Sequence, residues 1–145
     1  MEGWINVDSS PVVNPDRILD LEKNLPFEDN SIESVNADHV LEHLTNVFNA
    51  MEEIYRVCKN GAEIRIEVPH YKSPLAFTNP DHKHFFTEKT FEYYFDTAKE
   101  GNPFSKYVTY RFRMKSLKLI RDRRRFKPWF MWPVDRIRVV LIAVK

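Results

Sequence analysis

The sequence predicts a single α/β domain over residues 1–145, with a mainly parallel sheet and an antiparallel pair of strands at its C-terminal end. Short apolar stretches typical of strands alternate with stretches of helical periodicity, as in α/β proteins. Two long strand-like stretches, 107–121 and 136–145, follow one another, which favours an antiparallel pair. A chain of 145 residues with 43% hydrophobic residues is large enough for one core.

Composition excludes several classes of protein. The longest apolar run, Val139 to Val144, has six residues, whereas a membrane span needs about 20. Cys58 is the only cysteine, so it forms no internal disulfide and no cysteine-built zinc site, and a cytoplasmic protein is expected. The charge is unevenly distributed: residues 1–103 carry 9 Lys/Arg against 19 Asp/Glu, and residues 104–145 carry 13 against 2. Such halves attract one another or present a basic face to an anionic partner.

Three strands are expected in the N-terminal third, at 4–8, 17–21 and 32–40. Each is a short run with apolar alternation, and turn-forming residues separate the runs. The third has Val35 and Ala37 on one face. These stretches provide the first parallel strands of the predicted sheet.

A helix over 45–58 is the strongest local prediction, because its apolar residues recur on one stripe. Thr45 or Asn46 is expected to cap its start, and Gly61 to follow its end. Glu52 and Arg56 have the spacing of a helical ion pair. A strand follows at 62–68, where Ile64, Ile66 and Val68 alternate with charged residues.

The second half begins with a polar loop at 70–86 and a short helix at 87–94 capped by Thr87. The strand at 107–121 changes its apolar phase after Met114, which predicts a bulge. An aromatic and basic connection at 122–135 leads to the final strand, 136–145.

The ordered motifs of the chain resemble class I S-adenosylmethionine-dependent methyltransferases. The resemblance covers nearly the whole chain, including a loop similar to that of one bacterial and archaeal subgroup. It rests on 2–8 (EGWINVD), 20–22 (DLE), 25–31 (LPFEDNS), 39–44 (HVLEHL), 55–61 (YRVCKNG), 68–69 (VP) and 80–87 (PDHKHFFT). It implies a Rossmann-like methyltransferase sheet with S-adenosylmethionine as cofactor.

The same resemblance implies roles for residues at the strand ends. Asp8 matches the acid that binds the ribose hydroxyls, and Asp20 with Leu21 matches the pair near the adenine. Asp38 and His39 match the segment that lines the cofactor and substrate cleft. From the residues alone, Asp8 and Asp20 are also typical turn-forming acids.

The family's first strand and its Gly-x-Gly turn precede the position of Gly3, so we expect a sheet truncated at its N-terminal side. A central gap leaves unpaired backbone groups on both neighbours. Either Met1 is an internal methionine of a longer product, or the sheet closes differently. In the second case the strand 4–8 pairs with 32–40, or a partner supplies a strand.

Histidines provide the candidate chemistry. Among His70, His82 and His84, His82 is our candidate catalytic base for the acceptor. The segment 39–43 also matches H-x-x-E-H, in which His39, Glu42 and His43 would serve a zinc-dependent hydrolase. That motif needs one helix, whereas 32–40 reads as a strand, so no metal site is expected.

The expected function is methyl transfer to a small-molecule or sugar-like acceptor. The alternative is a methyltransferase-like binding or structural module that lacks the cofactor. Self-association is also expected, through the sheet edge near 4–8 or the aromatic connection at 126–132, because exposed apolar surface is costly. The basic and aromatic run from Arg121 to Trp132 is a candidate contact with a membrane surface or an anionic partner. Nucleic-acid binding is not expected, since no RNA-binding motif is present.

Overall fold

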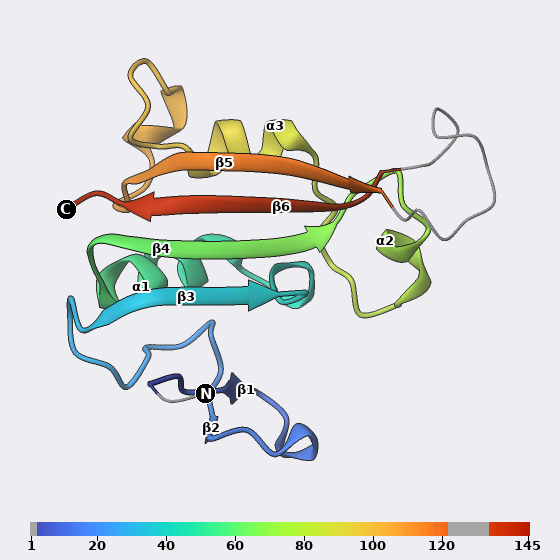
Figure 1. Cartoon of the computed structure of the whole chain (residues 1–145), viewed down its shortest axis with the longest axis horizontal. Helices are drawn as coiled ribbons and strands as arrows, with labels where there is room; N and C mark the ends of the chain where they lie inside the picture. The colour runs from blue at the N-terminus through green and yellow to red at the C-terminus, as the bar shows by residue number, and fades with distance from the viewer. Residues whose placement is uncertain (1–2, 122–133) are drawn as a thin grey trace.

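A four-stranded mixed sheet is the centre of the molecule in a computed structural model that describes residues 3–121 and 134–145 (Figure 1). β4 lies between β3, to which it is parallel, and β6, to which it is antiparallel. β5 is antiparallel to β6 and forms the edge. The predicted α/β class and the C-terminal antiparallel pair are therefore confirmed. The strands, in spatial order, are β3 (Ile32–Asp38), β4 (Cys58–Pro69), β6 (Val134–Ala143) and β5 (Phe112–Arg121).

Helix α1 (Val47–Val57) connects β3 to β4 and completes a parallel β-α-β unit. The side chain of Asn46 caps it by accepting the backbone N–H of Asn49 at 3.1 Å, so Asn46 rather than Thr45 is the capping side chain. The helix ends at Val57, earlier than predicted, because β4 begins at the next residue, Cys58. Gly61 does not follow the helix but lies inside β4 with a φ of 82°.

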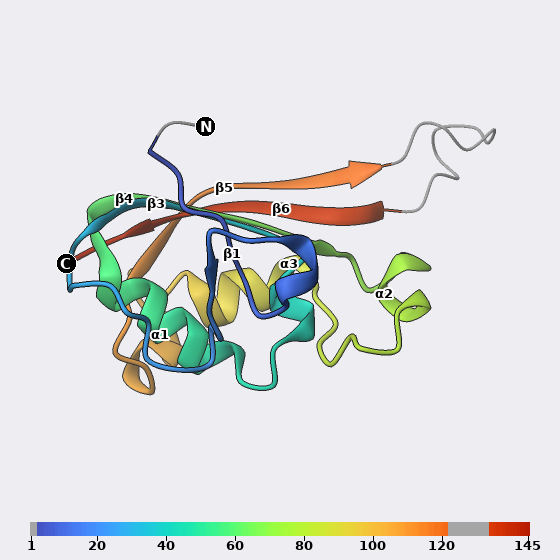
Figure 2. The same cartoon turned by 90° about the horizontal axis from the view of Figure 1, so that it is seen from below.

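The apolar core occupies one face of the sheet. Figure 2 shows α1, α3 and the turn that follows α3 on that side. β4 and β6 direct their buried residues to this face, whereas their alternate residues are mostly charged, as for a sheet with one face in water. The core includes Ile64, Ile66, Val68, Ile137, Val139 and Leu141. Burial also raises the pKa of the Cys58 thiol to about 11, so this cysteine remains a neutral, apolar group.

Aromatic side chains fill the core beside β5. Thr87 caps α3 (Glu88–Thr90) as predicted, and a π-helical turn, Phe91–Phe95, continues it. Phe91 packs on Phe86 and on Phe95, with ring centroids 5.6 Å apart in both cases. The hydroxyl of buried Tyr110 donates to the carbonyl of Tyr94 at 3.1 Å, which satisfies its one polar atom.

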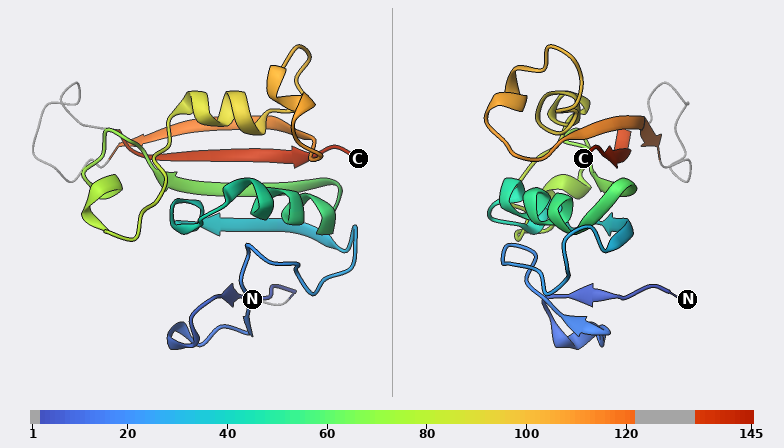
Figure 3. Two further views of the ribbon diagram at one scale, coloured as in Figure 1. Left: turned by 180° about the vertical axis from the view of Figure 1, so that it is seen from behind. Right: turned by 90° about the vertical axis from the view of Figure 1, so that its left-hand side faces the viewer.

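The N-terminal strands form a sheet of their own. β1 (Val7–Asp8) and β2 (Arg17–Ile18) are parallel to each other and shorter than the predicted 4–8 and 17–21. Figure 3 shows this pair set apart from β3, and within residues 3–121 and 134–145 no strand pairing joins the two sheets. The alternative in which 4–8 pairs with 32–40 is therefore wrong: β1 pairs with β2.

Several boundaries differ from those predicted. The strand 32–40 ends at Asp38, because the backbone of His39 turns into the left-handed region with a φ of 54°. The strand 107–121 begins only at Phe112, after a 3-10 turn at Pro103–Lys106. The loop 70–86 contains a short helix, α2 (Leu75–Thr78). The bulge after Met114 is confirmed by a register shift between Met114 and Ser116.

The connection predicted at 122–135 falls largely outside the described residues, as do 126–132 and all of the Arg121 to Trp132 run except Arg121. Within the described ranges, no helix combines the length and hydropathy needed to cross a bilayer.

Candidate functional site

The C-terminal edge, meaning the carboxyl ends of β1, β2 and β3 and the residues directly after them, is the candidate site. Asp8 ends β1, Asp20 follows β2, and Asp38 ends β3. Open α/β sheets bind ligands outside the carboxyl ends of their strands. Each predicted acid thus lies at or just after the carboxyl end of a strand, although the strands belong to two sheets that no strand pairing joins within the described residues.

Asp8 and Asp20 both shape the turns in which they lie. One carboxylate oxygen of Asp8, which is half-buried, accepts the N–H of Ser10 at 2.7 Å. Exposed Asp20 accepts the N–H of Glu22 at 3.0 Å and faces Lys23 at 3.3 Å. The hydrogen bond from Glu22, followed by that from Lys23, lowers the pKa of Asp20. Within residues 3–121 and 134–145, the second oxygen of Asp8, Oδ2, accepts no hydrogen bond.

Glu22 follows half-buried Leu21 and connects the segment after β2 to the start of α1. The sequence did not predict this contact. Its two carboxylate oxygens accept the backbone N–H groups of Thr45 at 2.7 Å and Asn46 at 2.9 Å. These are free N–H groups at the start of α1, where a carboxylate is stabilising. Accordingly, the pKa of Glu22 is lowered, chiefly by the hydrogen bond from the N–H of Thr45.

His39 occupies a constrained position at the end of β3. Its φ of 54° is unusual for a residue other than glycine, and its backbone N–H donates to the carbonyl of Glu67 at 2.9 Å. Its ring Nδ1 lies 2.9 Å from Oε1 of Glu42, so the imidazole donates to that carboxylate. The side chain of neighbouring Asp38 is exposed. Left-handed residues of this kind concentrate at ligand sites.

Glu67, in β4, forms ion pairs with two arginines of β6, Arg136 and Arg138. Its side chain is 8% exposed and receives Arg136 at 2.6 Å and Arg138 through Nε at 2.7 Å. Here an acid from the first 103 residues meets bases from the last 42, as the uneven charge distribution predicts. Asp38, His39 and Glu67 have potential ligand atoms within 4.8 Å of one another. Both carboxylate oxygens of Glu67, however, already accept hydrogen bonds from Arg136 and Arg138.

The three histidines of the 70–86 segment have different surroundings. His70 is buried, with Nε2 3.2 Å from a carboxylate oxygen of Glu88. His84 lies 3.4 Å from the carbonyl of Thr45. His82 is half-buried, and its Nδ1 lies 2.9 Å from the carbonyl of Ala76. A carbonyl only accepts, so Nδ1 carries the proton and Nε2 of His82 has a free lone pair.

The H-x-x-E-H segment does not form the geometry of a zinc peptidase. His39 follows a strand, whereas Glu42 and His43 lie in a single 3-10 turn, η2 (Leu41–His43). The φ of 54° at His39 is incompatible with a right-handed helix, so His39 and His43 do not share a helical face. Because β3 extends to Asp38, the residue before His39, the segment 39–43 cannot form the single helix that the zinc motif needs.

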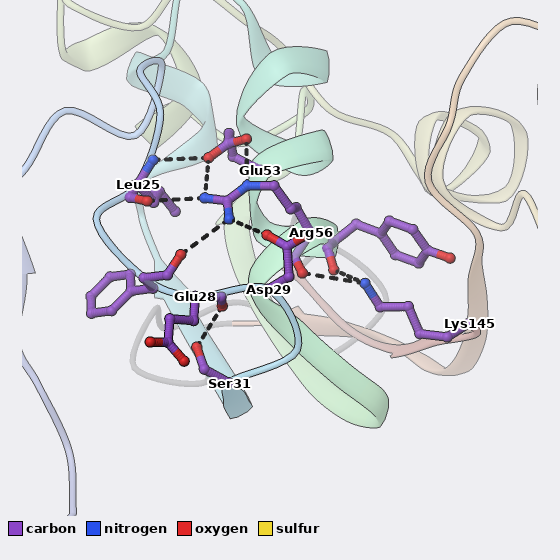
Figure 4. Close-up of polar contacts among 9 residues, drawn as sticks. Leu25, Glu28, Asp29, Ser31, Glu53, Arg56 and Lys145 are labelled. Carbon is purple, nitrogen blue, oxygen red and sulfur yellow. Dashed lines mark hydrogen bonds and ion pairs between the residues drawn. The ribbon is translucent and has the colours of Figure 1, made fainter.

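A second unpredicted feature is the cluster around Arg56, shown in Figure 4. Arg56 forms two hydrogen bonds with Glu53, at 2.9 and 2.8 Å, and a third with Asp29 at 2.5 Å. It also donates to the carbonyls of Leu25 and Phe27. The cluster fixes the segment before β3 against α1, and its role is structural.

Two residues of the C-terminal edge, Asp8 and Leu21, have the side-chain chemistry that the nucleoside half of S-adenosylmethionine requires. The free oxygen of Asp8 suits a ribose diol, and half-buried Leu21 suits an adenine ring. The methionine half needs close approach of the backbone at a glycine-rich turn. The three glycines of the chain, Gly3, Gly61 and Gly101, are far apart in the sequence and form no such turn.

Comparison with known proteins agrees with this geometry. Residues 8–66 match the model of a family described as "Methyltransferase domain". This part of the chain is similar to a methyltransferase domain. The resemblance to class I methyltransferases is thus confirmed, and the matched segment contains the cofactor candidates from Asp8 to His39. No curated protein is significantly similar in sequence.

Solved structures share the fold of this methyltransferase-like chain. The complex between the Haloferax volcanii Trm112 methyltransferase activator and a methyltransferase matches at 16% identity and a TM-score of 0.66, covering 96% of this chain and 71% of the other. An S-adenosylmethionine-dependent methyltransferase of Listeria monocytogenes matches at 10% identity and 0.61, covering 96% and 79%. The [4+2]-cyclase SpnF matches at 11% and 0.60, covering 88% and only 56%. The chain thus spans about half to four fifths of these proteins.

Proposed function

We propose that this chain serves S-adenosylmethionine-dependent methyl transfer to a small-molecule or sugar-like acceptor. The observation that carries the proposal is the set of polar residues at or just after the carboxyl ends of β1, β2 and β3, all within the segment that matches the methyltransferase family. Asp8 would hold the ribose, Asp20 and Leu21 the adenine, and Asp38 with His39 the wall towards the acceptor. Bound S-adenosylmethionine supplies an electrophilic methyl group.

The contribution of the chain is binding and orientation. Holding two reactants in line replaces much of the entropy cost of their encounter. His82 would accept the proton of an acceptor hydroxyl at Nε2, because Nδ1 is fixed as a donor to Ala76. The hydrogen bond between His39 and Glu42 keeps the end of β3 in one conformation.

Calorimetry with S-adenosylmethionine tests the proposal. We expect Asp8→Asn to weaken binding at least about tenfold, because a lost hydrogen bond to a charged group is worth about 1.5–3 kcal/mol. Glu33→Gln is the matched control: Glu33 is an exposed acid at the opposite end of β3, paired with Lys59 at 2.6 Å. Equal binding by Asp8→Asn and the wild type would contradict the assigned role of Asp8.

The alternative is a methyltransferase-like module that does not bind the cofactor. The scattered glycines favour it, and the SpnF match shows that proteins of this fold include a cyclase. A wild-type chain that gives no heat at millimolar S-adenosylmethionine would support the alternative and reject the enzyme proposal for this chain.

A further inference from the structure

Glu42 has a carboxylate oxygen that the fold leaves without a partner. The residue is 0% exposed, and Oε1 receives the His39 ring at 2.9 Å. Oε2 is fully buried and has no hydrogen-bond partner among the described protein groups. An unpaired, buried carboxylate oxygen is costly. Such a group in a folded protein commonly marks the place of an ion or another ligand.

Two imidazoles lie beside this carboxylate. One nitrogen each from His43 and His82 and one oxygen from Glu42 all lie within 4.8 Å of one another. The two rings meet edge-on, with centroids 4.7 Å apart and an interplanar angle of 74°. Ligand atoms around one tetrahedral ion are about 3–4 Å apart. Side-chain shifts of roughly 1 Å would therefore bring the three atoms into coordination distance.

Hydrogen bonds around the cluster prepare its ligands. Because His82 donates from Nδ1 to Ala76, it presents Nε2 as an unprotonated donor atom, the arrangement typical of metal-bound histidines. The ring of His39 donates a hydrogen bond to the carboxylate of Glu42 and so fixes the orientation of that carboxylate. His43 makes no side-chain hydrogen bond within the described residues, so its nitrogens remain available.

The backbone holds the two halves of the cluster together. Glu42 and His43 come from η2, and His82 comes from the loop after α2. The carbonyl of Glu42 accepts the N–H of Lys83 at 2.7 Å and that of His84 at 3.3 Å. The loop is thus fixed beside η2 without any ion, which makes the cluster a preformed site.

We propose that Glu42, His43 and His82 bind one divalent first-row transition-metal ion. Two imidazoles and one carboxylate suit Zn²⁺ or Fe²⁺ better than Mg²⁺ or Ca²⁺, and three protein ligands leave a position open for water or substrate. This site differs from the H-x-x-E-H set, because His39 is a positioning residue and His82 is the third ligand. The proposal also departs from the expectation from sequence, which named no metal site.

Metal binding is measured directly, so its test needs no assay of methyl transfer. The protein is freed of metal with a chelator, titrated with Co²⁺ while its visible ligand-field absorption is followed, and then competed with Zn²⁺. We expect one equivalent to bind, with Zn²⁺ displacing Co²⁺. Glu42→Gln and His82→Gln should each weaken binding about 100-fold or more, since each removes one of three ligands.

His84→Gln is the matched control, because His84 lies two residues from His82 but outside the cluster. It should bind metal like the wild type. Thermal unfolding without metal shows whether each variant folds, and Zn²⁺ should raise the Tm of the wild type and of His84→Gln only. A folded wild type that binds no Co²⁺ or Zn²⁺, or binding that survives both Glu42→Gln and His82→Gln, would overturn the proposal.

The same experiment separates the two roles considered for His82. A metal-bound Nε2 has no lone pair for a proton, so it cannot act as a general base. If metal binds, activation of an acceptor hydroxyl passes to the ion, which lowers the pKa of a bound hydroxyl group.

Discussion

Arg56 shows how much one side chain contributes when several groups converge on it. It is 28% exposed, and its planar guanidinium reaches two carboxylates and two backbone carbonyls at once. The N–H of Leu25 also donates to Glu53 at 2.8 Å. The pKa of Glu53 is lowered, chiefly by the hydrogen bond from Arg56 and also by that from the N–H of Leu25.

We expect Arg56→Lys to lower the free energy of unfolding by about 1–3 kcal/mol, because an ammonium group cannot reproduce a two-pronged contact and reach both carbonyls. Urea unfolding measures the change. Lys59→Met is the control, since the pair between Lys59 and Glu33 is exposed and should contribute less than about 1 kcal/mol. A similar decrease in the free energy of unfolding in the two variants would show that the several contacts of Arg56 contribute no more stability than an exposed ion pair.

Sequence periodicity could not identify the partner of Arg56. It predicted Glu52 at the i,i+4 position, whereas the structure pairs Arg56 with Glu53. Glu53 lies on the side of α1 that faces residues 25–31, and Glu52 instead accepts the N–H of Thr109 at 3.5 Å. Helical spacing allows both pairs, and tertiary contacts decide between them.

At the scale of elements, Glu22 is the link between the N-terminal sheet and α1. We expect Glu22→Gln to loosen residues 3–22 while leaving the main sheet intact, because a neutral amide oxygen accepts only part of the two N–H bonds that the carboxylate receives. Hydrogen exchange should rise in β1 and β2 and stay unchanged in β4 and β6.

Acid should reproduce this effect in the wild type. The pKa of Glu22 is lower in the folded chain, so the attachment is fully present above the ordinary pKa of about 4.3 and is lost as the pH falls through the lowered value. Exchange in β1 and β2 that is insensitive to both acid and Glu22→Gln would show that other contacts hold the N-terminal sheet.

Elements with their own periodicity were predicted well from sequence. The alternation of Ile64, Ile66 and Val68 and the apolar stripe of α1 both correspond to buried faces. β1 and β2 were predicted too long, because a strand persists only where a neighbour pairs with it. The cluster of Glu42, His43 and His82 brings His82 next to two residues that lie 40 and 39 positions earlier in the sequence, which no local pattern reveals.

For the whole molecule, self-association remains a prediction. β1 and β2 pair only with each other, and β3 only with β4, within residues 3–121 and 134–145. Val12, between β1 and β2, and Ile18, in β2, are 88% and 59% exposed. A second copy that covers this edge would satisfy its backbone groups and bury its apolar side chains.

Sedimentation at micromolar concentration tests this directly. We expect a species near twice 17.4 kDa for the wild type, and a shift towards the monomer in Ile18→Lys, because a charge at the edge opposes pairing. Lys118→Glu on the opposite edge strand, β5, is the control. A single species near 17.4 kDa would contradict the prediction.

The position of β6 in the sheet also sets the order in which the molecule can be assembled. β3, α1 and β4 are neighbours along the chain, but the other side of β4 remains open until β6 arrives, with Pro69 opposite Arg136 and Glu63 opposite Ile142. During synthesis, a nascent chain that has reached the loop after β4 therefore still lacks the core residues that β6 and β5 supply, such as Ile137, Val139, Leu141 and Phe112. Closing so long a loop makes folding slower than that of a helical bundle. Throughout that interval the open edge of β4 is where a chaperone or another nascent chain would bind.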